Sequence, residues 1–125
     1  MQNYATSTYT LNSNLTTKTG LNESTLHLIV STILTHINDV MYIKIFGSRA
    51  LGTHHKYSDI DIAISTTNNN QNTTNAKEHI EENTIYFTDM LIYEQITNNN
   101  LKAHIDEHAT TLYQNQRGDT NRNNI

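Results

Sequence analysis

The sequence has no cysteine, few basic residues and no long apolar run. The absence of cysteine among the 125 residues excludes a disulfide framework and leaves the redox compartment open. Eight Lys and Arg with a formal charge of −4 argue against binding of long nucleic acid, which needs clustered basic groups. No apolar run approaches the about 18 residues of a membrane helix, and the polar N-terminus does not resemble a signal peptide. We therefore expect a cytoplasmic protein that binds neither long nucleic acid nor a membrane.

The apolar content of 35% is low, and the deficit lies mainly in the two ends of the chain and in the loops rich in Asn and Thr. The length allows a single folded domain, with no room for a separate substrate domain. We expect a flexible polar extension over residues 1–20, the domain over residues 21–114 and a disordered tail over residues 115–125.

Apolar periodicity and turn residues predict the order of helices and strands. Residues 66–75 form a linker of Asn and Thr, too polar for a core. We expect a helix from Asn22 or Ser24 to residue 37, a strand over 40–46, a short helix over 48–51, a strand over 59–64, a helix over 76–82, a strand over 85–93, and a helix over 101–113 capped by Asn100.

One stretch, residues 43–64, combines two features of phosphate chemistry. Gly47 permits a tight turn after the first strand, and Ser48 stands where a helix begins, so its free N–H groups can attract phosphate. Ten residues later, Asp59 and Asp61 alternate with isoleucines, so both carboxylates should lie on one face of the strand. Because two carboxylates at this spacing repel each other unless a cation lies between them, the strand predicts a magnesium site.

Either feature alone is more often a plain turn or a solvated strand, but their order and spacing are specific. Gly47-Ser48, ten residues and then Asp59-Ile60-Asp61 resemble the signature of the nucleotidyltransferase superfamily that includes DNA polymerase beta. The sequence resembles the minimal nucleotidyltransferase branch in particular, and the likeness covers roughly residues 21–113. It implies an α/β (α+β) fold, with a small mixed sheet of three to four strands flanked by helices.

The resemblance implies a third carboxylate at Asp89, in the predicted strand over residues 85–93. A buried structural Asp at this position would need full compensation by hydrogen bonds, whereas joining Asp59 and Asp61 on an acidic face gives it a role. In the implied reaction, two Mg²⁺ ions held by Asp59, Asp61 and Asp89 assist transfer of a nucleoside monophosphate, with Asp89 taking the proton of the acceptor hydroxyl.

The nucleotide in this reaction is ATP by resemblance, since no residue selects a base. Gly47 and Ser48 would bind the outer phosphates. Arg49 would add positive charge, or project away from the turn. Two departures from the family pattern are Leu51, where many relatives carry a second basic residue, and Ala109, which replaces a glycine of the closing helix.

Relatives of this size are typically paired with an all-helical partner of the HEPN or nucleotidyltransferase substrate-binding type. The resemblance therefore implies a hetero-oligomer, in some versions a toxin-antitoxin pair whose antitoxin adds AMP to a tyrosine of the toxin. Two hypotheses stay open. The chain is an active nucleotidyltransferase, as its three carboxylates favour, or a catalytically silent module that covers its partner, as Leu51 favours.

Two groups of histidines allow further interpretations. His54, His55 and Lys56 lie between the two halves of the motif and either contact the nucleotide or stay at the surface. His104 and His108 stand four positions apart and could bind a metal, but the glutamate of a zinc-protease motif is missing.

Overall fold

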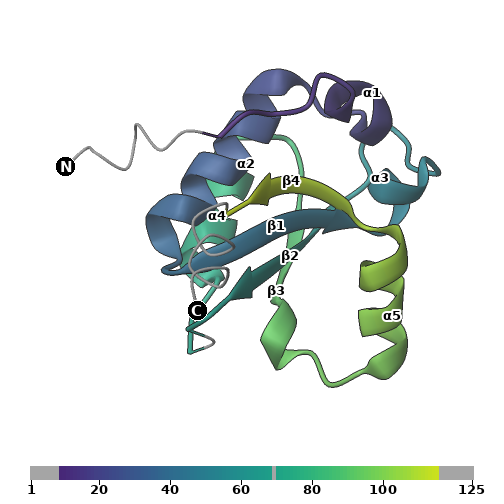
Figure 1. The fold of residues 1–125 in the computed structure, drawn as a ribbon. Coiled ribbons are helices and arrows are strands. Elements are labelled where there is room, and N and C mark those ends of the chain that lie inside the picture. Colours follow the sequence, from purple (N-terminus) through teal and green to yellow (C-terminus); the bar gives the residue numbers. More distant parts are fainter. Residues whose placement is uncertain (1–8, 69, 116–125) are drawn as a thin grey trace.

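A computed structural model describes residues 9–68 and 70–115 of the chain (Figure 1). Its elements follow the predicted order around the motif. They are α1 (Leu15–Thr19), α2 (Glu23–His36), β1 (Val40–Phe46), α3 (Ser48–Leu51), β2 (Ile60–Thr66), α4 (Thr74–Glu82), β3 (Thr88–Ile92), the 3₁₀ turn η2 (Tyr93–Gln95), α5 (Asn99–His108) and β4 (Thr110–Gln114).

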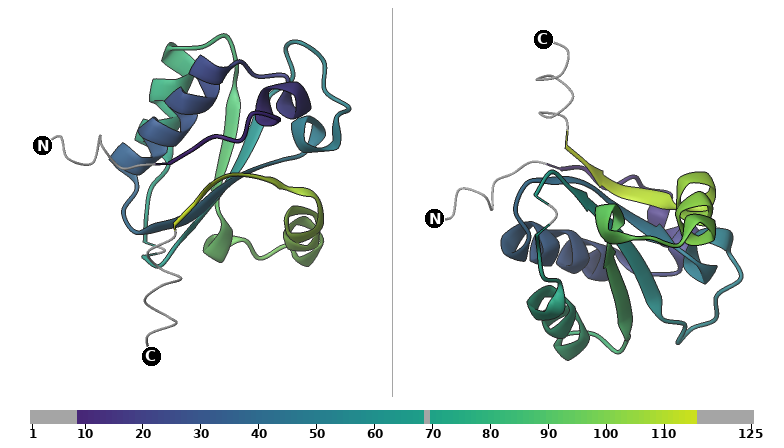
Figure 2. Two further views of the ribbon diagram at one scale, coloured as in Figure 1. Left: turned by 45° about the horizontal axis from the view of Figure 1, so that its top comes forward. Right: turned by 90° about the horizontal axis from the view of Figure 1, so that it is seen from below.

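The four strands form one mixed sheet in the order β3-β2-β1-β4. Strand β1 runs antiparallel to both β2 and β4, whereas β2 and β3 are parallel. Figure 2 shows α2 and α4 on one face of the sheet and α5 on the other. The predicted fold class, a mixed sheet of three to four strands flanked by helices, is confirmed.

The alternation predicted for the second strand is confirmed by the two clusters into which its side chains pack. Ile60, Ile62 and Ile64 are fully buried in the main core, which α2 and α4 cover. Ala63 faces the other way and packs with Phe46 and Ile105 of α5. Because successive side chains point to opposite faces, the acidic face of β2 lies under α5 rather than under the main core.

Helix α2 begins where the sequence predicts. Asn22 is its N-cap, and the Asn22 side chain accepts a hydrogen bond from the backbone N–H of Thr25 at 2.9 Å. The prediction for residues 1–20 is wrong at α1. Leu15 and Thr19 are buried there, and the Thr19 hydroxyl donates to the carbonyl of Leu15 at 2.7 Å. Residues 1–8 lie outside the described residues.

The closing helix is shorter than predicted. Helix α5 ends at His108, Ala109 is extended, and β4 pairs with β1 instead of continuing the helix. Within β4, Thr110 and Leu112 are buried while Thr111 is exposed, which is the alternation of a strand. Pairing with β1 therefore overrides the helical pattern of these residues.

Other predicted boundaries shift by a few residues. Asn98, not Asn100, caps α5, because its side chain accepts from the N–H groups of Asn100 and Leu101. Strand β3 begins at Thr88, after Ile85 and Phe87, which are exposed. Helix α4 begins at Thr74, inside the predicted linker. Of the predicted tail, only Asn115 is described, and its N–H donates to the carbonyl of Met41 at 2.8 Å.

Candidate active site

The Gly47 bend ends β1 and starts α3. Gly47 has φ 74° and ψ −151°, a conformation open essentially to glycine alone. A Cβ atom at this position would overlap Oδ2 of Asp61. The carbonyl of Gly47 accepts from the N–H groups of Ala50 and Leu51, both at 3.0 Å, and so forms the single turn of α3. The glycine therefore permits both the turn and the close approach of the carboxylate.

Replacing Gly47 by alanine is expected to destabilise the protein more than replacing Gly52. Both glycines have positive φ, 74° and 80°, but the space next to a Cβ at Gly52 is open. We expect about 1–3 kcal/mol from backbone strain at Gly47, plus the displacement of Asp61; Gly52→Ala should lose only about 1–2 kcal/mol. Urea unfolding of both variants measures the difference. Equal losses would contradict the predicted overlap with Asp61.

Asp61 and Asp89 are neighbours on parallel strands. They are Cα partners in the pairing of β2 with β3, so their side chains leave the same face of the sheet. Asp61 also pairs with Phe46 of β1, the residue before the Gly47 bend. Asp59 lies just before β2 and is exposed, as is Asp89, whereas Asp61 is half-buried. The register thus brings the bend and the carboxylates of two strands together.

The electrostatics of Asp61 reflect this crowding. Burial, and then the charges of Asp89 and Asp59, raise the pKa of Asp61 from 3.8 to about 6, against a smaller lowering effect of His104. Both neighbouring carboxylates therefore lie close enough to disfavour ionisation of Asp61.

The raised pKa of Asp61 predicts a pH-dependent loss of stability in the protein without metal. Because the folded state holds this proton up to about pH 6 and the unfolded state releases it near 3.8, stability should fall as pH rises between these values. The Asp61→Asn variant should lack this component and gain about 1–3 kcal/mol on the wild type between about pH 4 and pH 7. Urea unfolding across this range in EDTA provides the measurement. Parallel pH profiles would contradict the assignment.

His104 of α5 contacts the backbone of the Gly47 bend. Its Nε2 accepts a hydrogen bond from the N–H of Gly47 at 3.3 Å. The ring stands edge-on to Phe46, with centroids 6.3 Å apart, and lies 5.3 Å from the ring of His108. The sequence pattern drew attention to His104 only as one of a metal-binding pair. A contact across 57 residues of chain leaves no local signal.

Arg49 does not present its charge at the bend. Its side chain is 1% exposed. The guanidinium donates to the carbonyl of Thr19 at 2.8 Å and to that of Ser58 at 3.2 and 3.0 Å. Other donations go to the carbonyls of His55 and Lys56, and the group lies 4.9 Å from the ring centre of Tyr86. These bonds agree with the predicted alternative in which Arg49 projects away from the turn. Arg49 ties α1 and the loop before Asp59 to α3.

Comparison with known proteins places this geometry in a family. The family described as "Polymerase beta, Nucleotidyltransferase" matches residues 29–118. The chain belongs to this nucleotidyltransferase family. The matched region contains the Gly47 bend, the three carboxylates and His104.

Solved structures with the same fold come from toxin-antitoxin complexes. One is described as a toxin-antitoxin with AMP-PNP (22% identity, 76% of this chain and 77% of that chain covered, TM-score 0.66). Another is the MntA-HepT toxin-antitoxin (17%, 79% and 78%, 0.61). A third is the tri-AMPylated HEPN toxin of Shewanella oneidensis in complex with its MNT antitoxin (17%, 80% and 78%, 0.63). At these identities the likeness shows the fold alone. No curated protein sequence matches the chain significantly.

The carboxylate oxygens of this nucleotidyltransferase are the type of ligand that a hard divalent cation binds. Within residues 9–68 and 70–115, no three His, Asp or Glu side chains are already arranged to hold a metal ion. The available ligands are nevertheless carboxylate oxygens, which Mg²⁺ prefers, and their mutual repulsion is what a cation offsets. Asp59 and Asp89 are exposed, so their side chains can turn toward Asp61 without disturbing the packing.

The three loop residues predicted to contact the nucleotide or stay at the surface differ in burial. His54 is half-buried against Gly20, while His55 and Lys56 are exposed. His108 has its Nε2 3.5 Å from a carboxylate oxygen of Glu107. In the described part of the chain, no helix has the length and apolarity needed to cross a membrane.

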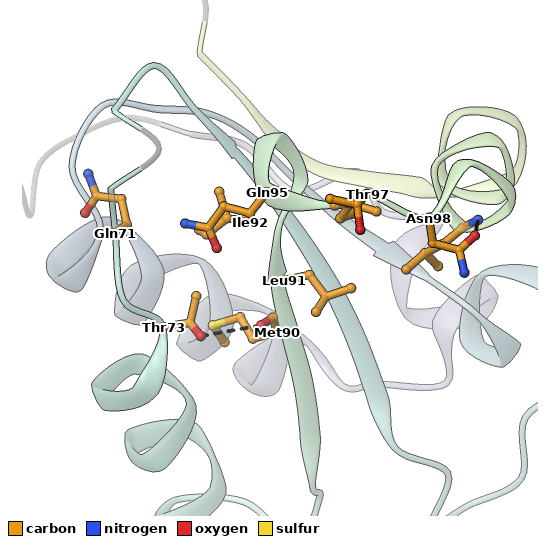
Figure 3. A pocket seen from close by; sticks show the side chains of 10 residues that line it. Gln71, Thr73, Met90, Leu91, Ile92, Gln95, Thr97 and Asn98 are labelled. Carbon is orange, nitrogen blue, oxygen red and sulfur yellow. Dashed lines mark hydrogen bonds between the residues drawn. The ribbon is translucent and has the colours of Figure 1, made fainter.

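A hollow of about 360 Å³ lies along β3 and the following turn (Figure 3). Its walls include Leu91, Ile92, Thr97 and Leu101, but none of the three carboxylates. Leu91 lies on the same strand as Asp89, two residues further on, so the hollow begins beside the acidic face of the nucleotidyltransferase. It offers an apolar wall next to the carboxylates.

Proposed function

We propose that this chain is a magnesium-dependent nucleotidyltransferase that transfers AMP from ATP to a hydroxyl group of a partner protein. The observation that carries the proposal is the in-register pairing of Asp61 with Asp89, directly against the Gly47 bend. A triphosphate bound at the bend would have its reacting phosphorus within reach of carboxylates from two strands. Membership of the nucleotidyltransferase family supports the same reaction type.

Each site residue has a distinct role in this reaction. Gly47 and Ser48 bind the outer phosphates through backbone N–H groups, with the Ser48 hydroxyl as a further donor. Asp59, Asp61 and Asp89 would hold two Mg²⁺ ions, which would supply positive charge to the reacting groups.

The bond changes follow from these positions. Asp89, exposed at the edge strand, accepts the proton of the acceptor hydroxyl. The hydroxyl oxygen then bonds to the α-phosphorus. The bond between the α-phosphorus and the oxygen that bridges to the β-phosphorus breaks, and pyrophosphate leaves. Ionised Asp89 is needed for the first step, and ionised Asp61 for metal binding.

The proposed partner is a helical protein of the HEPN type. Nucleotidyltransferase structures with the same fold occur in toxin-antitoxin complexes, one of which holds an AMPylated HEPN toxin. The chain itself leaves Ile85 and Phe87 66% and 71% exposed, just before Asp89. Apolar side chains beside the reacting groups fit an acceptor that is a protein surface. The chain would then act as the antitoxin of a pair.

The test combines the protein with the product of a neighbouring gene that encodes a small helical protein, ATP and Mg²⁺. We expect the partner to gain the mass of one or more AMP groups, as measured by intact-mass spectrometry, and EDTA to abolish the gain. CTP and GTP in place of ATP measure the base preference. Stable binding and inhibition of the partner without any mass gain would contradict the proposal.

A silent binding module is the second candidate, and specific observations favour it. Leu51 stands where many members of the resembled family carry a basic residue, and it is 49% exposed, while the charge of Arg49 is buried. Neither side chain therefore brings positive charge to the proposed phosphate position. The same mass measurement separates the candidates, because only the enzyme changes the mass of its partner.

A further inference from the structure

The proposed triphosphate site needs a side chain that donates a hydrogen bond to the outer phosphates. Backbone N–H groups alone leave most of the phosphate oxygens without a donor. Neither basic position of the motif provides one. Arg49 points to the carbonyls of Thr19 and Ser58, and Leu51 is apolar.

His104 stands at the N–H group that the proposed function assigns to phosphate. Its Nε2 accepts from the Gly47 N–H at 3.3 Å, and its ring is held edge-on against Phe46. The ring also lies within electrostatic range of the Asp61 carboxyl. An imidazole from α5 therefore lies beside both the bend and Asp61, next to the path proposed for the phosphate chain.

We propose that His104 is a phosphate-binding residue of this site. The inference rests on the proposed function. When the triphosphate binds, the Gly47 N–H donates its hydrogen bond to a phosphate oxygen instead of to His104 Nε2. His104 then donates a hydrogen bond from Nε2 to an outer phosphate. A neutral imidazole that accepts at Nε2 carries its proton on Nδ1, so binding requires the Nε2–H tautomer. His104 thus changes from an acceptor for the bend to a donor for the ligand.

Two opposing effects decide what removal of His104 does. Losing a hydrogen bond to a charged phosphate should weaken binding roughly 10–100-fold. Releasing the Gly47 N–H from its competing neutral bond should strengthen binding by roughly 2–10-fold. The phosphate contact is the larger effect, so the net expectation is binding about tenfold weaker.

The experiment measures binding of ATP and of inorganic tripolyphosphate, with Mg²⁺, by calorimetry on the full chain. His104→Ala should weaken both ligands by about tenfold, because the contact is to phosphate and not to the nucleoside. His104→Gln keeps a donor and an acceptor and should recover most of the affinity. His108→Ala, one turn along the same helix, is the matched control and should bind like the wild type. Circular dichroism melting confirms that each variant is folded.

A second measurement needs no variant. In the ¹⁵N spectrum of the imidazole, addition of tripolyphosphate to the wild type should move the proton of His104 from Nδ1 to Nε2. An unchanged His104 spectrum with ligand bound would overturn the inference. So would equal or tighter binding by His104→Ala, or an equal loss in His108→Ala, and the proposed function would then stand. Absence of ATP binding to the wild type would overturn both.

Discussion

Transfer of AMP to the partner should fall at least about a thousandfold when Asp61 is replaced by asparagine. Asp61 lies at the centre of the site, against the Gly47 bend and paired with Asp89. The amide keeps the size of the side chain but removes the charge that would hold Mg²⁺ in the proposed reaction, and metal ions contribute several kcal/mol to such transition states. A thousandfold loss corresponds to about 4 kcal/mol. Timed intact-mass spectrometry of the partner gives the rate.

The matched control is Asp106→Asn. Asp106 is an exposed carboxylate of α5 that accepts from the Tyr93 hydroxyl at 2.7 Å, outside the acidic face. This variant should transfer AMP at the wild-type rate. Asp61→Asn should still bind the partner, because the change is under α5 and not at the apolar surface of Ile85 and Phe87. An Asp61→Asn protein with more than about a tenth of the wild-type rate would contradict the central role of this carboxylate.

The sequence predicts the centre of the fold well because two local signals agree there. In β2, three isoleucines point into the core that α2 and α4 cover, whereas Ala63 between them packs against α5, so the side chains follow the predicted period of two. At the bend, a glycine followed by a serine marks the change from strand to helix, and α3 occupies the predicted residues. The pairing of Asp61 with Asp89 then follows from the register of the parallel strands β2 and β3.

Elements that depend on distant contacts could not be predicted in the same way. Residues 110–114 continue an acceptable helical pattern, and only pairing with β1 makes them a strand. Helix α1 has five residues and two buried ones, too few for a periodic signal. The contacts of His104 with Gly47 and of Arg49 with Thr19 join segments 57 and 30 residues apart. Such contacts are set by the assembled fold and not by local sequence.

Replacing Arg49 by methionine should cost about 3–5 kcal/mol of the free energy of unfolding. Methionine has a similar length but no donor, so the buried carbonyl of Thr19 and the carbonyl of Ser58 would lose their partner. Each unsatisfied buried acceptor costs about 1–3 kcal/mol. Such a loss is a large part of the 5–15 kcal/mol typical of a small domain. Urea unfolding followed by circular dichroism measures the change.

The choice of substitutions separates the geometry of the guanidinium from its charge. Arg49→Lys keeps the charge, but one ammonium group cannot span the carbonyls of Thr19 and Ser58, so it should recover only part of the loss. Lys56→Met removes an exposed charge from the same loop and should change stability by no more than about 0.5 kcal/mol. Because Ser58 precedes Asp59, Arg49→Met should also lower the rate of AMP transfer at temperatures where the variant is fully folded. A loss no greater than that of Lys56→Met would mean that the two carbonyls find water instead, and that Arg49 does not hold the loop in place.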